Sequence, residues 1–141
     1  MAASERISLY TGDEAVRVSR DLDLRQLAAH DPQWEFMLDN GALEVGFEGD
    51  DLALLVHSDG SWAIIESTWQ HDEFALFVLG AVATQPHTLH EGLRFIEELA
   101  LRAGCKYICF GSYRRGWERL AATLGFSRDG DDGYYEKRLY E

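Results

Sequence analysis

The chain has 141 residues, of which 46% are hydrophobic and 12% aromatic, and this is enough apolar material for one domain with a single core. The net charge of -12, from 25 acidic and 13 basic side chains, argues against a protein that wraps nucleic acid phosphates. The N-terminal residues lack the apolar core of a signal peptide, and no apolar run approaches the roughly 18 residues of a membrane span. We therefore expect a single domain over residues 1–141, soluble and located in the cytoplasm.

The two cysteines, Cys105 and Cys109, lie in a segment that predicts one buried strand. The two-residue period of a strand would point both thiols to the same side, where an intrastrand disulfide is geometrically unfavourable. No other cysteine is present to complete a metal site. We expect both to be reduced core residues and predict no metal at this pair.

The first third of the chain predicts a strand and two helices. Residues 7–10 form a short apolar strand, and Thr11 followed by Glu14 is the pattern of a capping box that opens a helix. This helix is expected to end before Pro32, because the residue before a proline disfavours helical backbone. A second short helix is predicted from Pro32 to a stop near Gly41.

The period then changes to that of strands. Leu43, Val45 and Phe47 alternate with acidic residues and predict a strand that turns at residues 49–51. Residues 52–57 and 62–68 predict the next two strands of a meander. The almost unbroken apolar run from Phe74 to Ala83 predicts a long strand buried on both faces.

From there the pattern is that of strand, helix and strand. Thr88 and Glu91 suggest a second capping box, and Gly104 ends the helix that they open. The remaining predicted elements are a strand over residues 106–110, a helix whose inner face is Trp117, Leu120, Ala121 and Leu124, and a closing hairpin over residues 126–129 and 134–140.

This order of elements, over nearly the whole chain, resembles the GNAT (Gcn5-related N-acetyltransferase) fold. The segment from Trp117 to Phe126, with its Leu124-Gly125-Phe126 ending, is similar to the fourth helix of that family. The resemblance implies an α/β (α+β) fold with a central, mostly antiparallel sheet of about seven strands and about four helices packed on both faces. The short chain, the tryptophan-rich strands and the Gly-Ser-x-x-x-Gly entry to the last helix are most similar to small GNAT-like proteins of tailed phages. A phage-encoded protein would lie in the host cytoplasm or in the virion.

The resemblance also identifies a degenerate acyl-CoA loop. Family members hold the CoA pyrophosphate with backbone N–H groups of a loop patterned Arg/Gln-x-x-Gly-x-Gly/Ala, which follows the long strand at Val82 in this sequence. Gln85 matches the first position of the pattern, but Thr88 and His90 replace the small residues. Side chains at these positions obstruct the close approach of phosphate to backbone.

The general acid of the family is replaced as well. Members that use a tyrosine place it where this chain has Ala121, and Tyr113 is the nearest substitute. If the protein is an enzyme, Glu66 or His57 are the candidate general bases. Each also has a structural interpretation, Glu66 as a solvent-facing strand residue and His57 as a strand-end residue beside a turn.

Three further groups suggest binding. His87, His90 and Glu91 have a spacing that metal ligands use, but a polar loop and helix cap explain them better, and we predict no metal there. A basic cluster is formed by Arg114, Arg115 and Arg119. Its charge would be neutralised by acidic neighbours in this chain, by an acidic partner or by a CoA phosphate. Trp69, beside a polar turn, is a candidate exposed contact for a partner protein.

Three functional hypotheses follow. The leading one is a non-catalytic binding or structural protein without a cofactor, phage-encoded, that associates with virion proteins or with a host factor. The alternative is an N-acyltransferase with acetyl-CoA as cofactor and an atypical site. The third, which depends on charge alone, is an acidic inhibitor that mimics nucleic acid. Under the first two, no direct nucleic acid or membrane contact is expected, and a homo-oligomer stays open.

Overall fold

The computed structural model describes residues 6–29, 32–111, 117–129 and 134–139. The strands are β1 (Ile7–Tyr10), β2 (Leu52–His57), β3 (Trp62–Gln70), β4 (Glu73–Val82), β5 (Tyr107–Gly111), β6 (Ser127–Asp129) and β7 (Tyr134–Arg138). The helices are α2 (Gly12–Ser19), the 3-10 helix η1 (Leu24–Ala29), α3 (Pro32–Asp39), α4 (Ala42–Glu48), α5 (Pro86–Arg102) and α6 (Trp117–Thr123).

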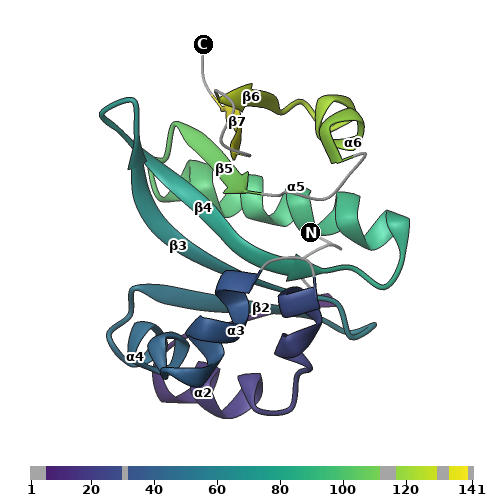
Figure 1. The fold of residues 1–141 in the computed structure, drawn as a ribbon. Helices are drawn as coiled ribbons and strands as arrows, with labels where there is room; N and C mark the ends of the chain where they lie inside the picture. The colour runs from purple at the N-terminus through teal and green to yellow at the C-terminus, as the bar shows by residue number, and fades with distance from the viewer. Residues whose placement is uncertain (1–5, 30–31, 112–116, 130–133, 140–141) are drawn as a thin grey trace.

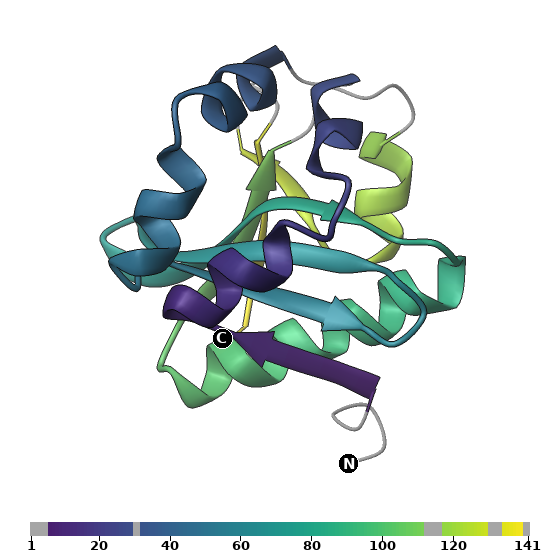
Figure 2. The same ribbon diagram turned by 90° about the horizontal axis from the view of Figure 1, so that it is seen from below.

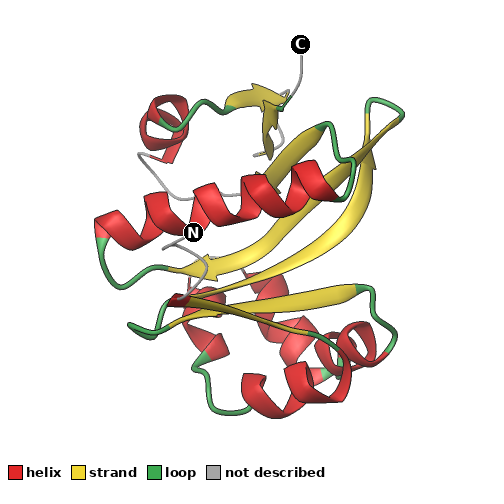
Figure 3. Cartoon of the chain, turned by 180° about the vertical axis from the view of Figure 1, so that it is seen from behind, coloured by secondary structure: helices red, strands yellow, loops and turns green. Residues whose placement is uncertain are grey.

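The strands form one seven-stranded sheet in the order β1-β2-β3-β4-β5-β7-β6. Neighbouring described strands are antiparallel, except that β4 and β5 run parallel. Helices lie on both faces of the sheet, with α5 on one side and α2, α3 and α4 on the other (Figure 1, Figure 3). The expected mixed α/β fold class with about seven strands is therefore confirmed.

One core lies between the sheet and α5 and α6. Ile96 and Ala100 of α5 and Ala121 of α6 are buried in one cluster with Leu76 of β4 and Ile108 of β5. Ile96 and Ala100 are four residues apart and therefore share one face of α5. Helices α5 and α6, both in the C-terminal half of the chain, therefore cover the apolar residues on this face of the sheet.

A second core lies on the opposite face, where α2 crosses the strands (Figure 2). Ala15 of α2, Trp34 of α3 and Phe47 of α4 are buried there against Leu54 and Ile64. Alternate residues of β2 and β3 thus serve the two cores, because successive side chains of a strand point to opposite faces.

The segment predicted as a strand over residues 43–47 is the helix α4. Leu43 and Phe47 are buried, whereas Val45 between them is 69% exposed. Two apolar residues four apart share one face of a helix, so the spacing of Leu43 and Phe47 fits a helix as well as a strand. The prediction of a strand here is wrong. A Cβ on Gly46 would lie 2.5 Å from Cδ1 of Leu52, so the glycine allows α4 to lie close to β2.

The boundaries of two other helices also differ from the prediction. Helix α2 ends at Ser19, whose hydroxyl donates to the carbonyl of Val16 at 2.8 Å, and η1 replaces the expected continuation toward Pro32. Thr11 is the N-cap of α2 but makes no side-chain capping bond. Helix α5 begins at Pro86, because a proline fits the first helical position, and Thr88 therefore lies inside its first turn rather than at its cap.

The prediction that the two cysteines face the same side of the sheet is wrong. Cys105 precedes β5 and belongs to the core under α5, whereas Cys109 packs with Tyr107 and Ala75 in a separate small cluster. The regular strand begins only at Tyr107, so the two-residue period does not extend back to Cys105. Both thiols are buried and free, and burial raises the pKa of Cys105.

The last strand in chain order ties the C-terminal elements together. Strand β7 lies between β5 and β6. Its Lys137 ammonium donates to a carboxylate oxygen of Glu97 on α5 at 2.7 Å and to the carbonyl of Leu124, just beyond α6, at 3.2 Å. One side chain thus joins β7, α5 and the end of α6.

A matched pair of helical glycines tests the close packing of α4. Both Gly46→Ala and Gly92→Ala should gain helix propensity, about 1 kcal/mol each. A Cβ at Gly92 meets no atom within 4 Å, whereas one at Gly46 meets Leu52. We expect the free energy of unfolding of Gly46→Ala to lie below that of Gly92→Ala by about 1–3 kcal/mol, measured by urea denaturation. Equal stability of the two variants would contradict this packing.

Candidate functional site

The candidate site begins where β4 and β5 part. The parallel pairing extends from Ala75 with Tyr107 to Val78 with Phe110 and includes no later residue of β4. On the other side, β3 pairs with Val78 and then with Gly80, so Leu79 is the extra residue of a β-bulge. Figure 1 shows β4 continuing past the end of β5 toward α5. Only Ala75 and Leu76 of β4 are buried, so the predicted burial of the whole strand on both faces is wrong for its other residues.

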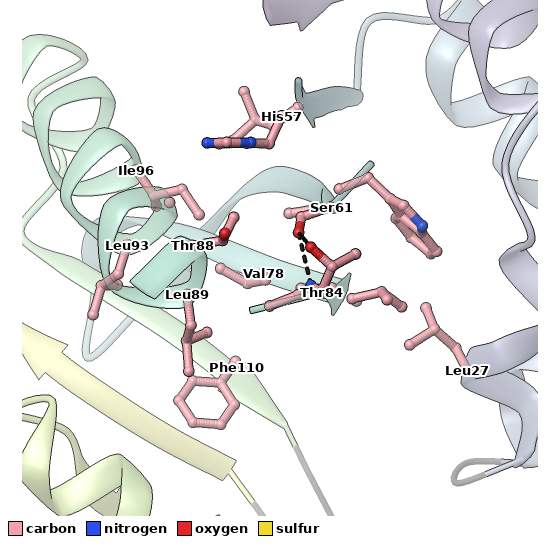
Figure 4. A pocket seen from close by; sticks show the side chains of 18 of the residues that line it. Leu27, His57, Ser61, Val78, Thr84, Thr88, Leu89, Leu93, Ile96 and Phe110 are labelled. Carbon is pink, nitrogen blue, oxygen red and sulfur yellow. Dashed lines mark hydrogen bonds between the residues drawn. The ribbon is translucent and has the colours of Figure 1, made fainter. Parts of the chain in front are cut away.

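A cleft of about 930 Å³ follows the second half of β4. Leu89, Leu93 and Ile96 of α5 and Phe110 of β5 line one part of it, and Leu27 of η1 lies on another (Figure 4). Its polar lining residues among those described are Gln26, His57, Ser61, Thr84, Gln85, Thr88 and His90. None of these described lining residues is Lys, Arg, Asp or Glu. The cleft is mostly apolar, and its polar groups gather near the start of α5.

His57, the last residue of β2, lines the cleft. It is 7% exposed, its Nδ1 accepts the backbone N–H of Asp59 at 3.0 Å, and its Nε2 lies 3.1 Å from a carboxylate oxygen of Glu91. A ring that accepts at Nδ1 donates from Nε2. Both nitrogens of His57 are therefore engaged, which favours its structural interpretation over a general base.

Asp59 connects the β2–β3 turn to the first turn of α5. Its Oδ2 accepts the hydroxyl of Thr88 at 2.5 Å, and its Oδ1 accepts the backbone N–H of Ser61 at 2.8 Å. The Thr88 bond, followed by the bonds to Ser61, holds the pKa of the Asp59 carboxyl well below its usual range despite partial burial. An ionised carboxylate of the protein itself is therefore held at the start of α5.

The start of α5 differs from a phosphate cradle in its backbone as well. Pro86 has no N–H to offer. The N–H of Thr88 donates to the carbonyl of Gln85 at 3.1 Å, and that of Leu89 does so at 3.4 Å. Thr88 itself is 3% exposed. The residues present therefore do not fit the pyrophosphate of CoA in the manner that the GNAT resemblance implies.

The structure brings the four predicted loop residues together. Val82, Gln85, Thr88 and His90 all line the cleft. Glu66 does not line it: this half-buried residue lies on β3, and burial, followed by the charge of Asp51, raises its pKa. The position of the family's tyrosine, Ala121, is fully buried in the core.

The predicted partner-binding residues are only in part described. Tyr113, Arg114 and Arg115 lie outside the described residues. Arg119 on α6 is exposed, and Trp69 near the end of β3 is 68% exposed, with an edge contact to the ring of Phe74.

Sequence reasoning missed the hydrogen-bonded group of His57, Asp59, Thr88, Ser61 and Thr84. The hydroxyl of Ser61 accepts the N–H of Thr84 at 2.8 Å, which joins the start of β3 to the loop after β4. The sequence Ser58-Asp59-Gly60 predicted the turn. It gave no signal that Asp59 accepts a hydrogen bond from Thr88, on a helix much later in the chain.

The described ranges contain neither a metal-binding cluster nor a membrane-spanning helix. No group of three or more His, Cys, Asp or Glu side chains there is arranged to hold a metal ion, including around His87 and His90. None of the helices in these ranges combines the length and apolar character of a membrane span.

The comparisons with known proteins identify the fold. No family model and no curated protein sequence matches the chain. Among solved structures, a GNAT-family acetyltransferase from Listeria monocytogenes is 14% identical, with a TM-score of 0.63 over 94% of each chain. The AtaTR complex bound with acetyl-CoA is 8% identical, with a TM-score of 0.61 over 96% of this chain and 94% of that one.

A third similar structure is the AtaT–AtaR complex bound to DNA. It is 10% identical, with a TM-score of 0.62 over 94% of this chain and 93% of that one. At these identities the similarity shows the GNAT fold alone.

The contact between Thr88 and Asp59 can be tested with Thr88→Val. The variant keeps the side chain's shape but removes the hydroxyl, and we expect a loss of about 1 kcal/mol in the free energy of unfolding at about pH 7. Because the pKa of Asp59 is lowered on folding, its ionised form stabilises the fold above the ordinary value of 3.8. This contribution shrinks as the pH falls below that value.

The deficit of Thr88→Val should therefore stay constant from about pH 7 to about pH 4 and narrow at lower pH, as the Asp59 carboxyl of the folded protein becomes protonated, measured by urea denaturation at each pH. Thr68→Val leaves the Asp59 contact intact and is the control. A deficit that keeps a constant size down to about pH 2 would show that the charge of Asp59 is not involved.

Proposed function

We propose that this protein is a non-catalytic binding protein that uses the GNAT fold as a scaffold for association with other proteins. The observation that supports this most is a hydrogen bond at the start of α5, where the hydroxyl of Thr88 donates to the carboxylate of Asp59 in the same chain. A helix N-terminus attracts an anion, and here the protein supplies one.

The charge of the cleft supports the same proposal. Acyl-CoA carries several phosphate groups, and proteins that bind them use cationic side chains or free backbone donors. The described lining residues include no Lys or Arg, and the chain as a whole carries a net charge of -12. Phosphates that approach this cleft therefore meet repulsion from the net negative charge of the protein, and no lysine or arginine among the described lining residues offsets it.

The second candidate is an acetyl-CoA-dependent N-acyltransferase. It is favoured by the cleft beside β4 and by the similarity to AtaTR, which was solved with acetyl-CoA. In that case the backbone near Val82 would contact the cofactor, and Tyr113 and Glu66 would be the candidate acid and base. Glu66 would need to act from outside the cleft, which makes this candidate the weaker one.

The partner that we propose is a protein. AtaT has been solved with the C-terminus of the antitoxin AtaR, so a protein with a similar fold binds a protein segment. Exposed Trp69 and the arginines 114, 115 and 119 are the proposed contacts in this chain. The finer role, association with phage structural proteins or with a host factor, follows the resemblance to small phage proteins, and mass spectrometry of purified virions tests it.

Calorimetric titration with acetyl-CoA tests the absence of cofactor binding. We expect no saturable heat up to about 1 mM ligand, because the amides, the charge and Thr88 all disfavour the pyrophosphate. A dissociation constant in the low micromolar range, about -8 kcal/mol, would overturn the non-catalytic proposal.

Acetyl-pantetheine, which lacks the nucleotide and its diphosphate, is the matched control ligand. Weak binding of acetyl-pantetheine without binding of acetyl-CoA would assign the exclusion to the phosphate end of the cleft. Tighter binding of acetyl-CoA than of acetyl-pantetheine would mean that a phosphate site exists after all.

A further inference from the structure

The edge of β4 that faces β5 is open over its second half. Among the described residues, no strand pairs with this edge beyond Val78, although β3 pairs with the opposite edge as far as Val82. The open stretch of Leu79, Gly80, Ala81 and Val82 spans roughly 13 Å at the rise of a strand. Its outward N–H and C=O groups have no ladder partner in the described chain.

Apart from the bulge at Leu79, the open stretch of this edge carries no residue of the kinds that usually prevent strand addition. Open edges are commonly protected by lysine, proline or an inward-pointing charge. Here the sequence from Leu79 to Ala83 is apolar and small, and the first proline follows at Pro86, inside α5. The bulge at Leu79 bends the strand without covering the residues after it.

The surroundings of the edge are apolar and uncharged. Leu89 and Leu93 of α5 line the cleft on one side, and Leu27 and Trp34 line it on the other (Figure 4 shows Leu27, Leu89 and Leu93). Leu89 is half-buried and is not a member of the core cluster under α5. Its side chain is therefore available to a ligand of the cleft.

We propose that the cleft binds an extended, uncharged and apolar peptide segment of a partner protein, which pairs with the open edge of β4 as an additional strand. This inference rests on the proposed function, since it names the chemistry that a partner of the scaffold would present. The peptide backbone supplies donors and acceptors at the spacing that the edge requires, and alternate side chains enter the cleft.

Other occupants match the cleft less well. A lipid chain fits the apolar walls but leaves the backbone groups of the edge unpaired. An acidic peptide is repelled by a chain of net charge -12, and a basic one finds no carboxylate among the described lining residues. An uncharged peptide satisfies both the edge and the walls.

The test uses a fluorescent, capped heptapeptide of alternating threonine and valine, titrated against the whole protein by anisotropy. Two N-methylated forms of the probe carry methyl groups on alternate backbone nitrogens in opposite phases. A strand that pairs through one edge loses binding when one phase is methylated and keeps it when the other is. We expect one phase to bind at least about tenfold more weakly than the other.

Variants of α5 locate the site. Leu89→Glu should weaken probe binding by at least about tenfold with an unchanged thermal midpoint, because it places a charge in the cleft without disturbing the core. Leu101→Glu on the same helix, at a position 41% exposed and outside the lining, is the control and should bind as the natural chain does. Hydrogen exchange should show new protection at amides within residues 79–82 on binding.

The outcomes separate this inference from the proposed function. Absence of saturable binding below about 1 mM, equal effects of both methylation phases, or protection confined to other strands would overturn strand addition at β4. Displacement of the probe by a neutral monoacylglycerol with no protection of residues 79–82 would assign the cleft to lipid instead. Tight acetyl-CoA binding in the calorimetric experiment would overturn the proposed function, whatever the probe does.

Discussion

The separation of β4 from β5 after Val78 is the constraint on which the rest of the site depends. Parallel strands pair only while their axes stay close, and the extra residue at Leu79 bends β4 away from its neighbour. The cleft, the open strand edge and the placement of α5 all follow from this divergence. A fold that separates two central strands creates a binding site in the sheet itself, and side chains around it then decide which ligand is accepted.

In the function that we propose, those side chains accept a protein ligand in place of a nucleotide cofactor. The start of α5 is held by Asp59, Ser61 and Thr88 in a group of hydrogen bonds that joins the β2–β3 turn to the helix. This group stabilises the local fold and engages the hydroxyl of Thr88, while the carbonyl of Gln85 accepts the backbone N–H groups of Thr88 and Leu89 that an external anion would need. Fold and activity are therefore separable, as is common among folds that serve many functions.

The sequence predicted the sheet, the long helix and the location of the loop, because periodicity and glycine stops report local backbone. The prediction failed where one spacing of apolar residues fits both a strand and a helix. Leu43 and Phe47 match the two-residue alternation of a strand, and their separation of four residues also matches one face of a helix. The prediction also failed at Thr88, whose hydroxyl bonds to a carboxylate 29 positions away in the chain and not to its own helix. Contacts between distant segments depend on how elements pack, and no local pattern encodes them.

The position of β7 between β5 and β6 has a consequence for folding during synthesis. The strand that joins β6 to the rest of this sheet is made after its neighbours on both sides, so the β5 edge has no β7 partner until residues 134–138 leave the ribosome. The ion pair of Lys137 with Glu97 forms only at that stage. A nascent chain that stalls before β7 exposes β5 and is at risk of aggregation, so the interval between the synthesis of β5 and that of β7 is the vulnerable period.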